Sequence, residues 1–538
     1  MSEPDAAPPW WRGAVVYEIY VRSFFDSNGD GCGDIPGIIA KLDYIQHLVV
    51  DAIWLSPIHP SPNCDWGYDV SDYGAVHPDF GTMADFERLL TAAHKRGLKV
   101  LLDGVLSHTS DQHEWFKESL TSRDNKKADW YVWADPKPDG TAPNNWLSAF
   151  GGPAWSYHPA RRQYYHHKFL RQQPKLNWRN GGARTAALRV LSAWLARGVD
   201  GFRLDVANSY LHDAALTDNP PVPESERTGL HWSQATNLQK HIHDSNLPEN
   251  AAALDYIRRT VDAFAHRFVF GEFYENAENS GGYLDPGKGL HSGYDFGLLD
   301  LHTLSAAAIR EYFARLARHS DYWPCLAFSN HDVMRVASRL GGENAGPDFA
   351  KLMLALLLTL RGTILLYQGE ELGLPEAQIA RDEIRDPFGK LYYPFFKGRD
   401  GCRTPMPWDG SQPALGFSKD KPWLPVSAEH KPFAVTVQEA NAQSPLQFAR
   451  AAVTERRKSA ALRLGDIEFL DTTGNVLAYE RKHGGKTVLC VFNLAAAPAR
   501  FADARLARAR GPLLATGGAR ADGPTLALGP FAAWVGDL

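Results

Sequence analysis

Eight short apolar stretches recur along most of the chain, and segments with the apolar spacing of a helix separate several of them. The stretches are AVVYEIYV, VDAIWLSP, LKVLLDGV, VDGFRLDV, FVFGEF, YDFGLLDL, CLAFSNHD and TILLYQGEE. Their length and their β-branched and aromatic residues are typical of buried strands. One intervening segment, TMADFERLLTAAHKRG, begins at Thr82 as an N-cap and stops at Gly97. Eight strand–helix units predict a parallel (β/α)8 barrel.

Two parts of the chain depart from this rhythm. Residues 107–178 are rich in Trp, Asn, Pro and Gly and are too long for a loop, so they predict a subdomain inserted after the third strand. From about residue 465, alternating runs such as NVLAYERK and TVLCVFNLA predict an antiparallel β domain over 465–538. The barrel then comprises 1–106 and 179–464. The polar segment 211–250, after the fourth strand, is expected to lie over the barrel mouth.

Composition excludes several classes of function. A net charge of −5 provides no basic field for nucleic acid or anionic lipid. The most apolar run, LMLALLLTL, is too short to span a bilayer, and the acidic, Pro-rich start MSEPDAAPPWW is not a signal peptide. Five widely spaced cysteines form neither a disulfide framework nor a CxxC metal pair. We therefore expect a cytoplasmic protein with no nucleic-acid or membrane partner.

Polar side chains stand where several of the predicted strands end. In a (β/α)8 barrel these ends meet at one mouth, where function collects. The residues concerned are Asp103, His108, Arg203, Asp205, Glu272, Asn330, His331 and Asp332. A single Asp at a strand end often only caps the next helix. Convergence of this whole set favours a catalytic centre.

The types of residue restrict the reaction. Glycoside cleavage needs one ionised carboxylate as nucleophile and one carboxylic acid that protonates the leaving oxygen. Asp205 lies two residues from Arg203, so both side chains face the same way on a strand, which suits the nucleophile. Glu272 follows the apolar run FVFG, which is expected to raise its pKa and suits the acid/base. Asp332 and His331 could bind sugar hydroxyls.

Four of these segments, DGVLSH, GFRLDV, FGEF and FSNHD, resemble in their order and spacing the four short regions of the α-amylase superfamily, glycoside hydrolase family 13. The resemblance covers essentially the whole chain and implies the inserted domain and the terminal β domain as well. It implies that Asp205 is the nucleophile, Glu272 the acid/base and Asp332 the third carboxylate. It also implies that the same subsite is lined by His108, Arg203 and His331.

The stretch SFFDSNGDGCGDIPGI opens like an EF-hand loop, but its twelfth position is Gly37, where an EF-hand carries Glu. Its oxygens could surround a hard cation, or the stretch could be a plain acidic turn after a strand. It is similar to the metal loop of the oligo-1,6-glucosidase branch, which implies a structural Ca²⁺ or Mg²⁺ and no organic cofactor. The implied ligands are Asp26, Asn28, Asp30, the carbonyl of Cys32 and Asp34.

Two further segments, DWGYDVSDY and GRDGCRTPMPWD, resemble places where exo-acting glucosidases of this family bind the terminal glucose. The resemblance implies a clamp of Asp65 and Arg399 with Tyr68 as a stacking face. The alternative is a Pro-rich connector whose arginines are surface charges. Phe169 and Phe150, in the inserted part, are weaker candidates for the pocket wall, because aromatic residues there are more often core.

The linkage that the chain would cleave stays open. Val206, directly after the predicted nucleophile, resembles the α-1,6-active members, but one methyl group discriminates weakly. Lys175, in QPKLN, stands where this branch typically has Asp.

We therefore expect a retaining exo-α-glucosidase of short α-glucosides such as maltose, isomaltose or sucrose, acting as monomer or homodimer. An α-glucosyltransferase or a sucrose isomerase is the alternative, although ARDEIRDPF lacks the RLDRD form of isomaltulose-forming relatives. A non-catalytic binding or transporter-associated subunit is disfavoured, because the chain keeps all three carboxylates.

Overall fold

The computed structural model describes residues 8–227, 235–273, 283, 289–318 and 322–538. Eight strands form one sheet in the order β10–β11–β1–β2–β3–β7–β8–β9, with parallel neighbours throughout. They are β1 (Val15–Ile19), β2 (Ala52–Leu55), β3 (Lys99–Gly104), β7 (Gly201–Leu204), β8 (Phe268–Phe273), β9 (Ser292–Asp295), β10 (Cys325–Leu326) and β11 (Thr363–Tyr367). The end strands β9 and β10 lie against each other. The predicted barrel is confirmed, in a nearly closed form.

Each barrel strand is buried on both faces. Along β1, Val16 joins the cluster inside the barrel, while Val15 and Tyr17 join the larger cluster between barrel and helices, because successive side chains point to opposite faces. Trp54 and Phe270 fill the interior. The surrounding helices are α1 (Ile35–Ala40), α2 (Leu42–His47), α3 (Met83–Lys95), α5 (Gly181–Ala196), α6 (Asn250–Asp262), α7 (Ala306–Leu316) and α8 (Pro347–Thr359).

The predicted start of α3 is confirmed in detail. The Thr82 side chain accepts from the backbone N–H of Asp85, and the Asp85 carboxylate accepts from the N–H of Thr82, which forms a capping box. Gly97, two residues after the helix, has a φ of +74°, a conformation that a side chain would strain. The chain can therefore turn directly into β3.

Two strands differ from the prediction. The sixth was expected over YDFGLLDL, but β9 ends at Asp295, whose Oδ1 accepts from the N–H of Gly297 at 2.9 Å and turns the chain. The seventh, β10, contains only Cys325 and Leu326, and the chain beyond them runs to Asp332 without a ladder. For β9, a local turn therefore ends the strand early.

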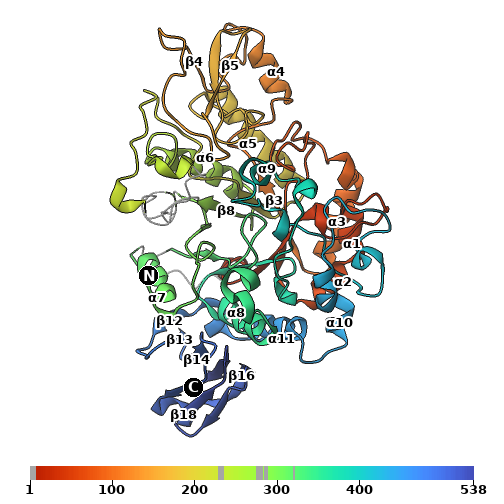
Figure 1. Cartoon of the computed structure of the whole chain (residues 1–538), viewed down its shortest axis with the longest axis vertical. Coiled ribbons are helices and arrows are strands. Elements are labelled where there is room, and N and C mark those ends of the chain that lie inside the picture. The colour runs from red at the N-terminus through yellow and green to blue at the C-terminus, as the bar shows by residue number, and fades with distance from the viewer. Residues whose placement is uncertain (1–7, 228–234, 274–282, 284–288, 319–321) are drawn as a thin grey trace.

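The inserted part carries its own sheet at one end of the molecule (Figure 1). Its antiparallel strands, in the order β4–β6–β5, are β4 (Trp133–Ala134), β5 (Trp155–His158) and β6 (Gln163–His166), and α4 (Glu114–Leu120) precedes them. A small core of Val132, Trp146, Ala154 and Trp155 supports it. All three strands lie within the predicted insertion, whose boundaries stay a prediction.

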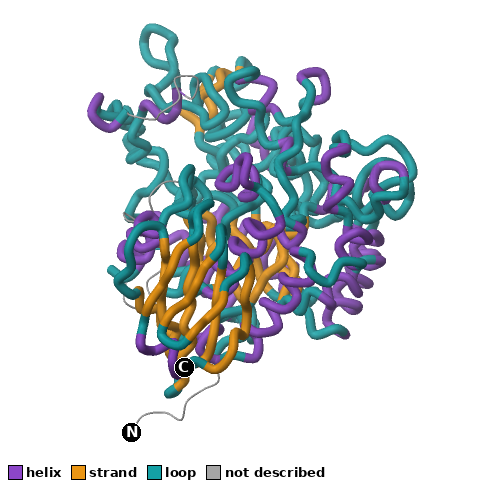
Figure 2. Tube along the Cα trace, turned by 60° about the horizontal axis from the view of Figure 1, so that its bottom comes forward, coloured by secondary structure: helices purple, strands orange, loops and turns teal. Residues whose placement is uncertain are grey.

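Two antiparallel sheets at the opposite end contain the C-terminus (Figures 1 and 2). The run NVLAYERK lies in β13 (Val476–His483) and TVLCVFNLA in β14 (Lys486–Asn493). The remaining strands are β12 (Asp466–Phe469), β15 (Ala499–Ala502), β16 (Arg510–Thr516), β17 (Arg520–Asp522), β18 (Thr525–Leu528) and β19 (Ala533–Asp537). Before them come α9 (Pro387–Tyr392), α10 (Val435–Glu439), α11 (Pro445–Lys458) and α12 (Ala460–Leu464).

Within the described ranges, every helix is too short or too polar to cross a bilayer. The polar segment predicted to lie over the barrel mouth is described except for residues 228–234, and its Thr236, Asn237 and Ser245 line the large cavity there.

Candidate active site

One buried guanidinium lies at the centre of the barrel mouth. Arg203 is fully buried, and its Nη1 donates to Asp103 Oδ1 and to Asp205 Oδ1, both at 2.9 Å. Its Nη2 contacts Glu272 Oε2 at 2.6 Å. Asp103 lies on β3, Asp205 directly follows β7, and Glu272 lies on β8. A single cation therefore holds carboxylates from three neighbouring strands.

The register of the barrel explains this convergence. Asp103 pairs with Arg203 across β3 and β7, and Glu272 pairs with Tyr294 across β8 and β9. The Tyr294 hydroxyl lies 3.1 Å from Arg203 Nη2 and 3.3 Å from Glu272 Oε1. Aligned parallel strands thus place side chains that are far apart in sequence at one level of the barrel.

Burial raises the pKa of Asp205 to about 7 and that of Glu272 to about 7, although Arg203 opposes the shift in both. The rise was expected for Glu272. For Asp205 the sequence predicts instead that Arg203 keeps the group ionised. The pKa is raised because Asp205 is only 6% exposed, and because Arg203 divides its charge among three carboxylates. Both groups therefore titrate near neutral pH.

Asp332 is held ionised by two arginines. Its Oδ1 accepts from Arg399 Nη1 at 3.1 Å and from Arg403 Nη2 at 2.6 Å. Burial would raise its pKa, but the charges of Arg399 and Arg403 hold it well below its usual range. This third carboxylate therefore carries its charge at every pH near neutrality.

Asp65 and Arg399 meet at one side of the site, although 334 positions separate them. Arg399 Nη2 donates to Asp65 Oδ1 at 2.7 Å, and Gln173 Nε2 donates to Asp65 Oδ2 at 3.0 Å. Arg399 also contacts Asp386 Oδ1 at 2.7 Å and lies over the ring of Phe150. The predicted clamp residues are in contact and are braced from two further segments.

The remaining predicted residues lie between these groups. Tyr68 stacks on His331 at a ring distance of 5.4 Å, and its hydroxyl lies 3.0 Å from Asp103 Oδ2. His108 Nε2 lies 2.8 Å from the carbonyl oxygen of Tyr68, and Phe169 packs edge-on against its ring. Burial lowers the pKa of His331 to about 3 and that of His108 to about 4, so both are neutral imidazoles.

Val206 adopts an unusual backbone conformation directly after Asp205. Its φ is +38°, in the left-handed region where a β-branched residue is strained by about 1–3 kcal/mol. Its amide N–H donates to Glu272 Oε2 at 3.1 Å. The strained turn therefore aims a backbone donor at the predicted acid/base.

A cavity of about 790 Å³ opens above these residues, which is within the usual range for a ligand site. One wall is polar and includes Asn208, Ser209, Thr236 and Ser245. The lining also has an apolar part, which includes Phe296, Leu299, Val333, Met334, Phe388 and Phe396. Asp205, Glu272 and Asp332 line its floor, and Arg203 and His331 contact them from below.

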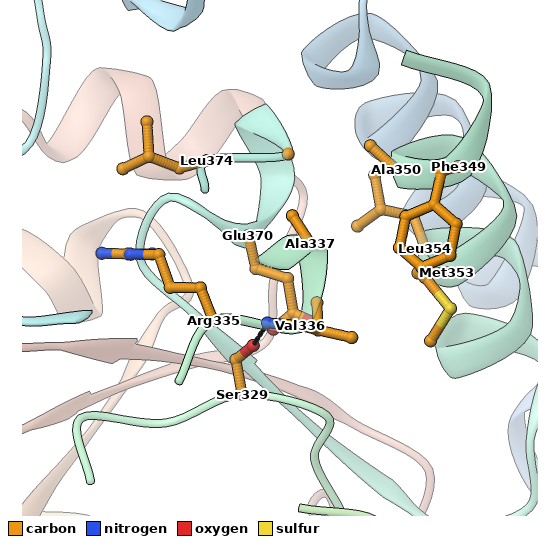
Figure 3. A pocket seen from close by; sticks show the side chains of 11 residues that line it. Ser329, Arg335, Val336, Ala337, Phe349, Ala350, Met353, Leu354, Glu370 and Leu374 are labelled. Atoms are coloured by element: carbon orange, nitrogen blue, oxygen red, sulfur yellow. Dashed lines mark hydrogen bonds between the residues drawn. The ribbon is translucent and has the colours of Figure 1, made fainter. Parts of the chain in front are cut away.

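A second cavity lies between α8 and the segment around Glu370 (Figure 3). It offers only about 10 Å³, room for one water molecule. Among the described residues, Glu370 Oε1 has no hydrogen-bond partner, and burial raises the pKa of Glu370 to about 8. This cavity is too small for a sugar.

Sequence reasoning missed several contacts at the site. Arg403 donates to Asp332 from the same motif as Arg399, and Asp386 braces Arg399 from within ARDEIRDPF, so both were within quoted segments. Glu18 contacts His331 Nδ1 at 2.5 Å from β1. Gln173 opens the quoted segment QPKLN, but its contact with Asp65 was not predicted.

In the predicted metal loop, the carboxylates accept hydrogen bonds from backbone N–H groups of the same loop. Asp26 Oδ1 accepts from the N–H groups of Asn28 and Gly29, and Asp34 Oδ1 accepts from that of Gly37 at 2.6 Å. An all-oxygen set of donors suits Ca²⁺ or Mg²⁺. In the described part of the chain, no three Asp, Glu, His or Cys side chains converge as metal ligands would. The ligand set, with Asp30 and the Cys32 carbonyl, stays a prediction.

Comparison with known proteins places this geometry in context. Residues 18–465 match the family model described as the α-amylase catalytic domain. The chain is 49% identical to a probable α-glucosidase of Rhizobium meliloti (strain 1021) over 92% of its own length and 90% of the relative's. It is 35% identical to an oligo-1,6-glucosidase of Bacillus cereus over 90% and 91% of the two lengths.

The fold was also compared with solved structures. The crystal structure of the α-glucosyl transfer enzyme XgtA superposes with a TM-score of 0.94 at 49% sequence identity. The match covers 99% of this chain and 100% of that one. The barrel, the inserted sheet and the C-terminal sheets are therefore those of a known enzyme architecture.

Proposed function

From the premise that the chain belongs to the α-amylase family of glycoside hydrolases, in its α-glucosidase and oligo-1,6-glucosidase branch, we propose that it is a retaining exo-α-glucosidase of short α-glucosides. The observation that carries the proposal is the single Arg203 guanidinium that contacts Asp103, Asp205 and Glu272 on the floor of the cavity. Maltose, isomaltose and sucrose are the proposed substrates.

In the first step Asp205 attacks the anomeric carbon, and Glu272 gives its proton to the leaving oxygen. The bond between C1 and the leaving group breaks, and an ester between C1 and Asp205 forms. For this step Glu272 has to be protonated and Asp205 ionised, and burial raises the pKa of both groups to about 7. Arg203 contacts both, at 2.9 Å from Asp205 Oδ1 and 2.6 Å from Glu272 Oε2, so its charge stabilises the carboxylate form of each. Asp332 is proposed to bind hydroxyls of the same sugar.

In the second step Glu272 removes a proton from water, which attacks C1 and releases Asp205 and α-glucose. The same ester can instead react with the hydroxyl group of another sugar or alcohol, which gives transglucosylation. The similarity to XgtA, an α-glucosyl transfer enzyme, favours this second outcome as the alternative function. The cavity has room beyond the clamp for such an acceptor.

The test is an NMR time course on a mixture of maltose, isomaltose and sucrose that follows every product and the anomer released. Free α-glucose from one of them supports hydrolysis and identifies the linkage. Accumulation of new glucosides while free glucose lags supports transfer, and conversion of sucrose to an isomeric disaccharide supports the sucrose-isomerase alternative. Release of β-glucose would contradict the retaining mechanism.

Exo action is proposed to depend on the clamp. Replacing Arg399 with Ala removes the partner of Asp65 and leaves that carboxylate buried, 4% exposed, with Gln173 Nε2 as its remaining side-chain donor. We expect KM to rise by about 10- to 100-fold, with a smaller loss in kcat, because the clamp binds the sugar in both ground and transition states. Steady-state kinetics check this. Unchanged kcat and KM would exclude the clamp.

We also propose that the loop containing Asp26, Asn28, Asp30, the Cys32 carbonyl and Asp34 binds a structural Ca²⁺ or Mg²⁺. Its oxygen donors support this, although the carboxylates would have to turn away from the amides that they accept from. We expect CaCl2 to raise Tm and EDTA to lower it by a few degrees in the wild type. An Asp30→Ala variant should show no difference. Equal Tm values for the wild type under both conditions would contradict the proposal.

A further inference from the structure

Lys175 is a buried ammonium whose partner is a backbone carbonyl. Its side chain is 1% exposed, and its Nζ donates to the carbonyl oxygen of Ser209. Buried lysines are usually paired with a carboxylate. The carboxylate nearby, Asp244, instead contacts Lys168 Nζ at 3.2 Å and His241 Nδ1 at 3.0 Å. Burial lowers the pKa of Lys175 to about 7.

The groups around Lys175 do little to balance its charge. Those that face it from β3, the inserted sheet and the segment after β7 are His108, His166, Lys168, His212 and Asp244. Burial lowers the pKa of His212 to about 3 and that of His166 well below its usual range, so both are neutral. Within the described ranges, neither ring nitrogen of His166 has a hydrogen-bond partner.

The backbone of Lys175 is rigidly held. It forms an isolated β-bridge with His108, which lies four residues after β3. Its N–H donates to the carbonyl of His166 at 2.9 Å, and its own carbonyl accepts from Val132 at 3.1 Å. Lys175 therefore extends from the junction between the barrel and the inserted sheet, and this junction provides a fixed base for its side chain.

The carbonyl that Lys175 binds belongs to the turn after the nucleophile. Ser209 lies four residues beyond Asp205, and its N–H donates to the carbonyl of Val206 at 3.0 Å. Ser209 and its neighbour Asn208 line the polar wall of the large cavity. A shift of this carbonyl would therefore move both the turn that follows Asp205 and the part of the cavity lining formed by Asn208 and Ser209.

We propose that Lys175 is a positioning residue for the second half of the reaction. Through Ser209 it fixes the polar wall, and its state of protonation sets how well an acceptor hydroxyl competes with water for the glucosyl group. The inference rests on the proposed glucosyl–Asp205 intermediate.

The chemistry of that step is the same for both competitors. The acceptor oxygen bonds to C1, the bond from C1 to Asp205 breaks, and Glu272 takes the proton from the acceptor hydroxyl. Water needs little orientation, whereas a larger hydroxyl compound needs the wall in place. A charged ammonium binds a carbonyl roughly twice as strongly as a neutral donor. Deprotonation of Lys175 should therefore loosen the wall and favour water.

The first experiment measures stability and needs no turnover. Tm is recorded from pH 6 to pH 9 for the wild type, Lys175→Met and the control Lys126→Met, an exposed lysine of the inserted part. Because the folded pKa of Lys175 lies below that of the unfolded chain, the folded state binds fewer protons above pH 7, and stability rises with pH there. The difference in Tm, wild type minus Lys175→Met, should therefore increase as pH rises. A constant difference would contradict the proposal.

The second experiment measures how the intermediate is partitioned. With methanol at fixed concentration, methyl α-glucoside and glucose form from the same intermediate. Their ratio is therefore independent of the rate of the first step and of the protonation state of Glu272, which affect both products equally. The wild-type ratio should fall roughly threefold from pH 6 to pH 8.5. In Lys175→Met it should be low and flat, and in Lys175→Arg it should stay high at both pH values. A flat wild-type ratio, or a wild-type slope in Lys175→Met, would refute the positioning role.

The two experiments separate the two hypotheses. If Asp205→Asn still turned over substrate, the proposed function would fail, while the Tm comparison would still report on Lys175. If the partition were insensitive to Lys175 in an enzyme that depends on Asp205, only the inference would fail.

Discussion

Asp205→Asn should fold normally and lose turnover of its best α-glucoside by about 10⁴-fold or more, because no carboxylate remains to form the ester at C1. The amide can still accept from Arg203 Nη1, which lies 2.9 Å from Asp205 Oδ1, so the floor of the cavity keeps its shape. Kinetics at saturating substrate measure the loss. A variant that keeps the wild-type rate would exclude Asp205 as the nucleophile.

Stability provides the control for this variant. Burial raises the pKa of Asp205 to about 7, above its value in the unfolded chain, so the protonated group contributes stability that is lost as pH rises from about 4 to about 7. Asn resembles the protonated acid, and its contribution to stability does not change with pH. At pH 8 the Tm of Asp205→Asn should therefore equal or exceed that of the wild type. A sharply lower Tm would attribute the lost activity to misfolding.

Glu272→Gln should lower turnover of maltose-type substrates by about 10²- to 10⁴-fold, because it removes the proton donor of the first step and the base of the second. With 4-nitrophenyl α-glucoside the leaving group needs little protonation, so a burst of nitrophenolate should precede slow turnover. Added azide attacks without a base, and it should speed that turnover and yield α-glucosyl azide.

The pH profile of kcat/KM should also identify Glu272 as the acid/base. The wild type needs one proton on the pair of carboxylates whose pKa values burial raises to about 7, so kcat/KM should be bell-shaped. In Glu272→Gln the alkaline limb should vanish. A variant that retains this limb and shows no azide effect would place the acid/base on another residue.

The barrel and the residues at its mouth could be predicted because each strand is visible in the sequence as a short apolar stretch. Apolar strands of the right length imply parallel ladders, and ladders carry Asp103, Arg203 and Glu272 to the same end of the barrel. The sixth strand was misplaced because Asp295 turns the chain where the apolar pattern continues to Leu301.

Charge sharing could not be predicted from the sequence. The spacing of Arg203 and Asp205 indicates an ion pair, but not that Asp103 and Glu272 bind the same guanidinium and weaken its hold on Asp205. The contact from Lys175 to Ser209 could not be predicted either, because it joins segments 34 positions apart.

The seam between β9 and β10 has a consequence for motion. The sheet order begins at β10 and ends at β9, and in the described ranges these two strands contact each other without pairing. β10 contains only two paired residues, and the segment that follows it carries Asp332. Amide hydrogens beside this seam should exchange with solvent before those of β1, β2 and β3, which have ladders on both sides. We therefore expect the segment that carries Asp332 to be less protected from exchange than the strands at the middle of the sheet.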